Sequence, residues 1–225
     1  MKRAIPALAV LLCCVTVTWA QPAGATPTTP GSSYTVRERA LKIPEIITAL
    51  GLKDGSVMAD IGAGDGDYEV LLSRAVGSAG RVYAEDIRES AVKELHKVVT
   101  NNRLDNVTVL QGDPDDPKLP SGALDAVLMV ITYHEVVPYQ KMLERVMTTL
   151  KPGGRFVVVD MMPYKTLTRP RADQTKNHRI ASGLAESEIR SAGFEVVSRD
   201  DRFIDEPDEE STRWMIVSRK PGSPL

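Results

Sequence analysis

Short apolar runs alternate with amphipathic stretches along most of this chain, and each change of pattern marks a predicted element. Brief, mostly apolar runs are typical of strands buried in a parallel sheet. We expect strands at 57–61, 81–87, 107–110, 123–132, 155–160, 194–197 and 214–218. Apolar residues three or four apart predict helices over 44–50, 70–76, 90–100, 139–150 and 185–192. Strands that alternate with helices indicate an α/β fold with a mostly parallel sheet.

The stretch 57–68 carries the most distinctive pattern. An apolar run containing Asp60 is followed by Gly62, Gly64 and Gly66, and a helical pattern begins after them. Glycines let the backbone turn tightly and approach a ligand, and the start of a helix offers free N–H groups to it. Strand, glycine turn and helix therefore predict a nucleotide-type cradle in an open α/β sheet.

The spacing of this turn argues against a dinucleotide. Asp67 stands where the fingerprint G-x-G-x-x-G has its third glycine. Asp60, Asp65 and Asp67 would surround a pyrophosphate with carboxylates and repel it. A ligand with an ammonium as well as a carboxylate suits the turn better, and S-adenosylmethionine has both groups, together with a sulfonium. A nicotinamide-dependent dehydrogenase is the weaker alternative.

An acid followed by G-x-G-x-G resembles the first motif of the class I S-adenosylmethionine-dependent methyltransferases, including UbiE-like methyltransferase domains. Asp60, Gly62, Gly64 and Gly66 match that motif position by position, and Leu-Lys-Pro-Gly-Gly at 150–154 resembles the turn before the family's fifth strand. The resemblance covers about residues 40–220. It implies a Rossmann-like, seven-stranded, mostly parallel sheet in the order 3-2-1-4-5-7-6, with strand 7 antiparallel and helices on both faces.

The resemblance also assigns cofactor contacts. Asp86, at the end of the second strand, is expected to bind the ribose hydroxyls, while Glu85 points away from the cleft. Asp113 is expected to accept from the adenine amino group, although Asp115 and Asp116 follow closely. The expected cofactor-binding residues are Asp60, Gly62, Ala63, Gly64, Gly66, Asp86, Ile87, Gly112, Asp113, Pro114 and Ile131.

Acceptor chemistry is expected where the fourth predicted strand ends, beside the sulfonium. His134 is the predicted base, with Glu135 to orient it; alternatively, His134 caps a helix or packs against the adenosine. His178, in the basic segment 161–180, could contact an acidic or phenolic substrate. The candidate catalytic residues are His134, Glu135, Tyr133 and His178. We predict no metal site, because the sequence offers no convincing cluster of ligands.

The first residues carry a separate signal. Lys2 and Arg3 precede an apolar run over 4–17 that ends near Ala20, which is typical of a secretory signal peptide. We expect a signal peptide over 1–20, cleavage after Ala20 or Ala25, a flexible linker over 21–35 and the methyltransferase domain over 36–225. The expected location is periplasmic; the alternative is an uncleaved segment that tethers the chain to the inner membrane.

The charge and composition of the chain limit the kinds of partner that it is expected to bind. The chain has 28 Lys and Arg against 30 Asp and Glu, so nothing in its charge favours nucleic acid. The sequence therefore predicts a methyltransferase that acts, as a monomer or homodimer, on an unidentified small molecule. Because S-adenosylmethionine is made in the cytoplasm, the alternative is an exported, non-catalytic binding protein of the same fold.

Overall fold

A computed structural model describes Met1 and residues 41–163, 165, 167–205 and 212–222. The predicted signal peptide over 1–20, both cleavage points and the linker over 21–35 lie outside these residues. In the part of the chain that is described, no helix combines the length and the apolar character that a membrane crossing requires.

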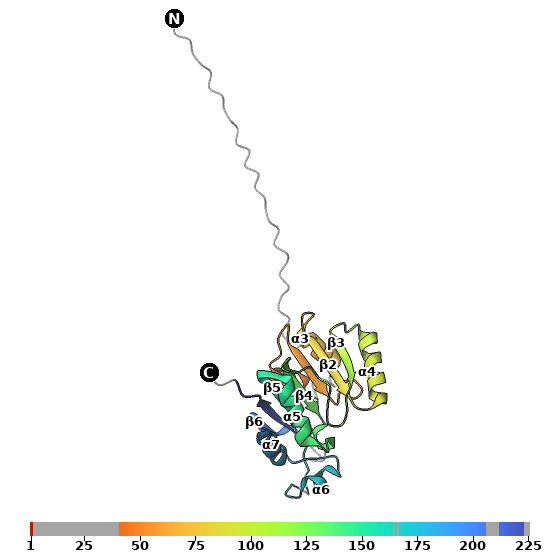
Figure 1. The fold of residues 1–225 in the computed structure, drawn as a ribbon, viewed down its shortest axis with the longest axis vertical. Coiled ribbons are helices and arrows are strands. Elements are labelled where there is room, and N and C mark those ends of the chain that lie inside the picture. The colour runs from red at the N-terminus through yellow and green to blue at the C-terminus, as the bar shows by residue number, and fades with distance from the viewer. Residues whose placement is uncertain (2–40, 164, 166, 206–211, 223–225) are drawn as a thin grey trace. The chain divides into compact units, whose positions relative to one another are not determined.

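Strands and helices alternate along the described chain, as the sequence predicts (Figure 1). The strands are β1 (Val57–Ile61), β2 (Arg81–Asp86), β3 (Val107–Gln111), β4 (Leu124–Val130), β5 (Leu150–Met161), β6 (Glu195–Ile204) and β7 (Arg213–Arg219). The helices are α2 (Ile43–Leu50), α3 (Glu69–Val76), α4 (Glu89–Asn102), α5 (Tyr139–Thr149), α6 (Arg171–Thr175) and α7 (Ser182–Ser191), with the 3-10 turn η1 (Tyr133–Glu135) after β4.

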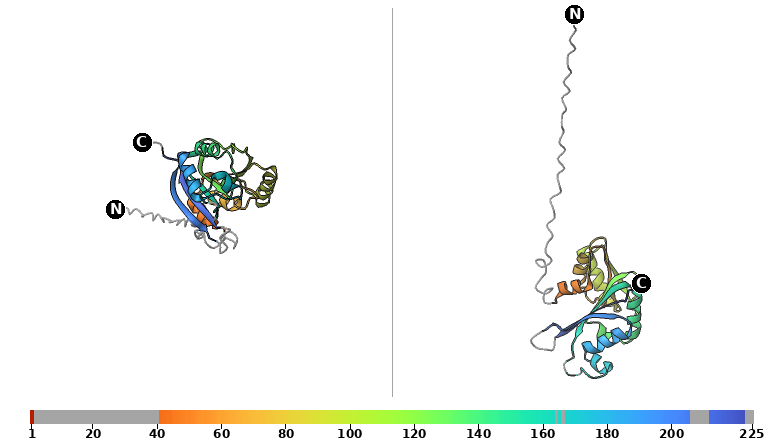
Figure 2. Two further views of the ribbon diagram at one scale, coloured as in Figure 1. Left: turned by 90° about the horizontal axis from the view of Figure 1, so that it is seen from below. Right: turned by 90° about the vertical axis from the view of Figure 1, so that its left-hand side faces the viewer.

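The strands form one seven-stranded sheet in the order β3-β2-β1-β4-β5-β7-β6. β1 pairs in parallel with β2 and β4, and the outer pairs β2–β3 and β4–β5 are also parallel. β7 runs antiparallel to both β5 and β6, and these last two strands, drawn in blue, form one side of the sheet (Figure 2). The fold class and strand order implied by the resemblance are confirmed.

Two apolar cores lie on opposite faces of the sheet, because successive strand residues point to opposite sides. Along β4, Ala126 and Leu128 belong to the core covered by α2, α3 and α4. Val127 and Met129 belong to the core covered by α5 and α7. The central strands are therefore buried on both faces, which explains why their sequences read as continuous apolar runs.

Three regions differ from the sequence prediction. β5 begins at Leu150, which already pairs with Leu124, so the predicted turn over 150–154 is part of this strand. β6 continues to Ile204, well beyond the predicted strand over 194–197, because its pairing with β7 extends that far. Most residues in this part of β6 are exposed and polar, so the apolar pattern does not reveal them. The segment 161–180, where the apolar pattern predicts no strand or helix, contains the short helix α6.

Candidate cofactor and acceptor site

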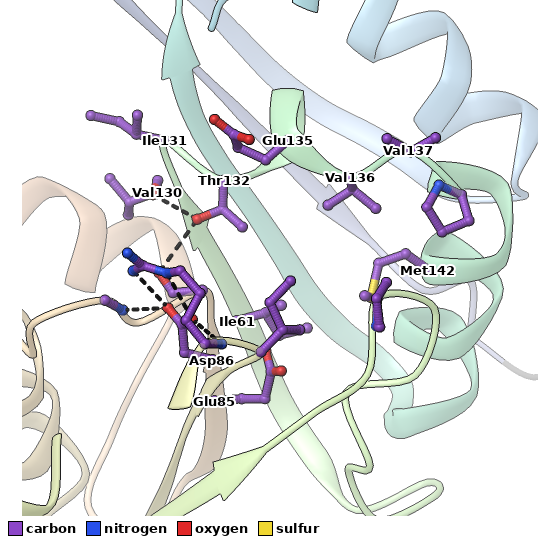
Figure 3. Close-up of a pocket in the computed structure, with 16 residues that line it drawn as sticks. Ile61, Glu85, Asp86, Val130, Ile131, Thr132, Glu135, Val136, Val137 and Met142 are labelled. Atoms are coloured by element: carbon purple, nitrogen blue, oxygen red, sulfur yellow. Dashed lines mark hydrogen bonds and ion pairs between the residues drawn. The ribbon is translucent and has the colours of Figure 1, made fainter. Parts of the chain in front are cut away.

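A pocket of about 620 Å³ opens at the carboxyl ends of β1, β2 and β4 (Figure 3). β1 lies between β2 and β4, where the strand order reverses, and open α/β sheets bind ligands at such a point. The lining residues are Ile61, Gly62, Gly64, Glu85, Asp86, Ile87, Arg88, Pro114, Val130, Ile131, Thr132, Glu135, Val136, Val137, Pro138 and Met142.

The first two glycines of the turn form one wall of this pocket. Gly62 has φ +75°, and a Cβ there would overlap the side chain of Thr132. Thr132 Oγ1 donates to the carbonyl oxygen of Val130 at 3.0 Å, so its position at the end of β4 is fixed. Glycine at position 62 therefore lets the turn after β1 lie against the end of β4.

Asp86 is the best-held side chain of the pocket. Its carboxylate, 4% exposed, accepts hydrogen bonds from the backbone N–H of Gly64 at 3.1 Å and of Arg88 at 2.9 Å. The guanidinium of Arg88 adds two contacts at 3.2 Å. The side chain of Arg88 is 62% exposed, so it can swing into solvent and leave the Asp86 carboxylate open to the pocket.

The structure brings only part of the predicted cofactor set to the pocket. Gly62, Gly64, Asp86, Ile87, Pro114 and Ile131 line it. Asp60, Ala63, Gly66, Gly112 and Asp113 do not appear among the lining residues.

Local contacts explain why three of these five residues lie outside the pocket lining. A Cβ at Gly66 would press on Val98 and Leu95 of α4, so this glycine serves the approach of a helix. A Cβ at Gly112 would overlap the carboxyl of Glu85. The Asp113 side chain is 57% exposed and pairs with Lys118 at 3.2 Å.

The sequence predicts that three charged carboxylates surround the glycine turn, and the structure differs from this prediction. Asp60 is buried; burial first, and then the charge of Glu69, raises its pKa well above the ordinary value. Burial raises the pKa of Glu69 to about 7. These two carboxyls therefore do not carry two full negative charges, and Asp65 and Asp67 are exposed outside the pocket lining.

Glu85 contradicts the prediction that it points away from the cleft. It lines the pocket while only 1% exposed (Figure 3). The parallel pairing of Ile61 with Glu85 places it beside the end of β1, and Gly112 leaves the space that its carboxyl occupies. Burial is the main cause that raises the pKa of Glu85 to about 7.

Three of the four candidate catalytic residues gather at the edge of the pocket. The Nε2 atom of His134 lies 3.1 Å from Oε1 of Glu135, and Nδ1 of His178 lies 2.6 Å from the same oxygen. Glu135 also lines the pocket. Residues 43 positions apart in the sequence therefore meet, because the segment after β5 returns to the edge where β4 ends.

Asp160, at the carboxyl end of β5, is the acid that orients His134. It is fully buried, and it accepts from the backbone N–H of His134 at 2.9 Å and contacts Nδ1 of the ring at 2.7 Å. Burial disfavours the charged ring, yet the hydrogen bond and charge of Asp160 outweigh burial and raise the pKa of His134 above its ordinary value. Glu135, the predicted orienting residue, faces the other ring nitrogen.

Tyr133 lies apart from this cluster. It is completely buried, and its hydroxyl donates to Glu188 at 2.8 Å. The guanidinium of Arg171 lies 5.0 Å from the centroid of its ring. Tyr133 therefore fixes η1 against α7, and the structure gives its hydroxyl no place in the pocket.

Sequence reasoning missed several residues of the site. They are Thr132, Asp160, Arg88, Val136, Val137, Pro138 and Met142. Asp160 and Thr132 had a readable signal, because each ends a predicted apolar strand whose carboxyl end must face the ligand crevice.

The sheet order and the pocket at its switch point define a Rossmann-like methyltransferase fold. Residues 58–154 match the family model described as "Methyltransferase domain". Among curated proteins, the chain is 31% identical over 115 residues to the ubiquinone/menaquinone biosynthesis C-methyltransferase UbiE of Marinomonas sp. (strain MWYL1). That match covers 51% of this chain and 46% of the relative, so the chain spans about half the length of the curated protein it matches.

Solved structures share the fold over a longer range. A SAM dependent methyltransferase from Aquifex aeolicus has a TM-score of 0.69 at 23% identity, covering 83% of this chain and 94% of that one. The [4+2]-cyclase SpnF has a TM-score of 0.66 at 16% identity, covering 83% of each chain. The description of the Aquifex protein names S-adenosylmethionine, whereas that of SpnF names a cyclase, so the shared fold alone does not define the reaction.

Proposed function

We propose that this chain is an S-adenosylmethionine-dependent methyltransferase that acts on a small-molecule acceptor. The observation that carries this proposal is the pocket itself, in which Gly62 lies against Thr132 and Asp86 stands at the end of β2. A glycine cradle and a strand-end acid are the two features that hold the cofactor in such sheets. The match of residues 58–154 to a methyltransferase family model supports it.

The pocket residues divide the cofactor among them. Asp86 would hold the ribose once Arg88 has moved, since a carboxylate can accept from both hydroxyls. Ile87 and Pro114 would flank the adenine, and Gly62 and Gly64 would lie under the amino-acid part. When bound, S-adenosylmethionine supplies an activated methyl group, so the protein needs chiefly to align the acceptor and exclude water.

The acceptor is proposed to lie between Glu135 and the apolar wall of the pocket. Val136, Val137, Pro138 and Met142 form that wall, and apolar walls with few polar groups are usual for small-molecule sites. Figure 3 shows Val136, Val137 and Met142 on one side and Asp86 on the other, with Glu135 at the rim. His134 and His178 contact Glu135 from outside the lining.

His134 remains the proposed acceptor-side residue, as the sequence predicts. It can serve as a base only when its Nε2 atom is free of Glu135, because Asp160 holds the other ring nitrogen. Asp160 is thus proposed as a positioning residue that fixes the ring through Nδ1.

Calorimetry with S-adenosylmethionine, followed by an acceptor screen, tests this function. We expect binding at one site per chain and the release of S-adenosylhomocysteine, detected by mass spectrometry, with at least one small-molecule pool. Binding without product in every pool would favour the exported, non-catalytic binding protein. Binding of NAD with no binding of S-adenosylmethionine would overturn the proposal.

We also propose that the chain is exported to the periplasm, with residues 1–20 as the signal peptide. The support is the basic start and the short apolar run in the sequence. N-terminal sequencing of protein recovered from the periplasm should begin at Gln21 or Thr26. An intact N-terminus in the membrane fraction would favour the uncleaved tether, and a cytoplasmic location would exclude export.

A further inference from the structure

Three side chains with metal-binding atoms converge beside the pocket. The ligand atoms of His134, Glu135 and His178 all lie within 4.8 Å of one another. The two imidazole rings meet edge to face, with centroids 5.8 Å apart and planes at 85°. His134 and Glu135 come from η1, while His178 follows α6, so two separate segments supply the cluster.

Both ring nitrogens of His134 face carboxylate oxygens. Asp160 is an obligate acceptor when ionised, so Nδ1 carries the proton that it receives at 2.7 Å. A neutral ring would then present a lone pair from Nε2 to Glu135 Oε1 at 3.1 Å. Two lone pairs at that distance repel, and either a second proton or a metal ion between them removes the repulsion.

The distances from Glu135 to the two histidines are close to those in a metal site. Bonds of 2.0–2.1 Å in a tetrahedral site place neighbouring ligand atoms roughly 3.3 Å apart. Glu135 Oε1 lies 3.1 Å from His134 Nε2 and 2.6 Å from His178 Nδ1. The side chain of His178 is 75% exposed, so it can retreat by the small distance that an ion needs.

Two further features indicate a prepared site. A buried carboxylate on the distal nitrogen of a histidine is the usual partner of a metal-bound imidazole, and Asp160 supplies it. His178 has φ +55°, a left-handed conformation that is costly for a residue with a side chain. The backbone is therefore held in an unfavourable conformation at the residue that completes the cluster.

We propose that His134 Nε2, Glu135 and His178 bind one divalent first-row transition-metal ion, such as Zn²⁺. Two imidazoles and one carboxylate are a known zinc set that leaves a further position open, whereas Mg²⁺ and Ca²⁺ prefer oxygen ligands alone. Because Glu135 also lines the pocket, the open position would face the acceptor and take an oxygen atom from it. That last step rests on the proposed methyltransferase function, with His134 then acting as a metal ligand in place of a base. The metal site itself does not rest on that function.

Titration of the untagged full chain with Zn²⁺ after chelator treatment tests the site. Calorimetry should show one ion per chain, and Co²⁺ in its place should give the visible absorption of a low-coordinate nitrogen and oxygen site. His178→Ala and Glu135→Gln should each weaken Zn²⁺ binding at least tenfold. Asp160→Asn should weaken it about 10- to 100-fold, as expected for the partner of a ligating histidine.

His96→Ala is the matched control, because His96 lies exposed on α4 away from the cluster. It should bind Zn²⁺ as the unaltered chain does. Failure of the unaltered chain to bind one Zn²⁺, or equal affinity in His178→Ala, would overturn the proposal. The titration contains neither S-adenosylmethionine nor acceptor, so its result does not depend on whether the methyltransferase proposal is correct. Absence of Zn²⁺ binding would likewise leave the methyltransferase proposal standing.

Discussion

Asp86 has four hydrogen-bond donors around it although it is the residue expected to hold a ribose. The backbone donors, Gly64 and Arg88, fix where the carboxylate lies, whereas the exposed guanidinium of Arg88 covers it. A ribose diol would replace the guanidinium and keep the backbone contacts. The carboxylate is therefore positioned before the cofactor arrives.

Asp86→Ala should weaken binding of S-adenosylmethionine by ~1–3 kcal/mol, the range for losing hydrogen bonds to a charged group. Calorimetry with the purified variant measures this loss. Asp113→Ala is the matched control, because Asp113 is exposed and outside the pocket lining, and its affinity should stay unchanged. Equal losses of affinity in both variants would show that binding of the ribose does not depend on Asp86.

Gly62→Ala should lower the free energy of unfolding more than Gly122→Ala does. Both glycines have positive φ, +75° and +61°, so both variants carry backbone strain. Only at Gly62 would the new Cβ overlap a neighbour, Thr132, whereas nothing lies within 4 Å at Gly122. Urea unfolding should show an extra loss of about 1–3 kcal/mol at Gly62, the usual cost of overpacking. Equal losses would mean that strain alone explains the glycine.

The sequence predicts the residues of this site that act locally and misses the contacts that are made across the fold. Gly62, Gly64 and Asp86 sit in one strand–turn–helix unit and the strand that follows, so spacing and the family resemblance together locate them. Asp160 reaches His134 from a different strand, and His178 reaches Glu135 from beyond α6. No periodicity links such positions, so only the folded chain shows that His134 is oriented by Asp160.

Helices α6 and α7 are tied to η1 by one buried arginine. Arg171 donates to Glu188 at 2.8 Å and to the carbonyl oxygens of Tyr133 and Val136 at 2.9 and 3.0 Å. Its side chain is 15% exposed, and that of Glu188 is 7% exposed. Since Tyr133 and Val136 flank His134 and Glu135, this tie also supports the acceptor side of the pocket.

Arg171→Ala should destabilise the domain by about 3 kcal/mol, because it leaves the buried Glu188 without its cation. Adding Glu188→Gln should recover part of that loss by removing the uncompensated charge. Thermal and urea unfolding of the single and double variants measure both effects. Lys93→Ala, which breaks the exposed pair with Glu89 on α4, is the control and should cost less than about 1 kcal/mol. A similar loss of stability in Arg171→Ala and Lys93→Ala would contradict a buried ion pair between Arg171 and Glu188.

The apolar pattern locates elements well where both faces of a strand are buried and poorly elsewhere. β1, β4 and the second half of β5 read as apolar runs because each contributes to both cores. β6 lies at the edge of the sheet, so most of its residues face solvent and its length follows from pairing with β7. The short helix α6 is fixed by Arg171 and its distant partners, which no local pattern reports.

The whole domain should lose stability as pH rises between about 4.5 and 7. Burial is the main cause that raises the folded-state pKa of Glu69 and of Glu85 to about 7. An acid with a raised pKa binds more protons in the folded state than in the unfolded state, so deprotonation favours unfolding. For Glu69, the loss across this window is on the order of 1–3 kcal/mol.

Urea unfolding at pH 5 and pH 8 measures this loss. In Glu69→Gln, which cannot ionise at this position, the difference between the two pH values should shrink. Glu89→Gln, whose side chain is 72% exposed, is the control and should keep the full difference. A protein that is more stable at pH 8 than at pH 5 would contradict the claim that Glu69 and Glu85 are buried in their neutral, protonated form.

The sheet cannot be completed until β7 has been synthesised. In the described sheet, β6 is joined to the rest only through β7, although β6 comes earlier in the chain. A nascent chain interrupted before Arg213 would leave the side of β5 with bare N–H and C=O groups, and β6 would have nothing to attach to. Such an edge invites pairing with other chains. Premature termination here should therefore yield an aggregation-prone fragment that depends on chaperones, and not a smaller folded domain.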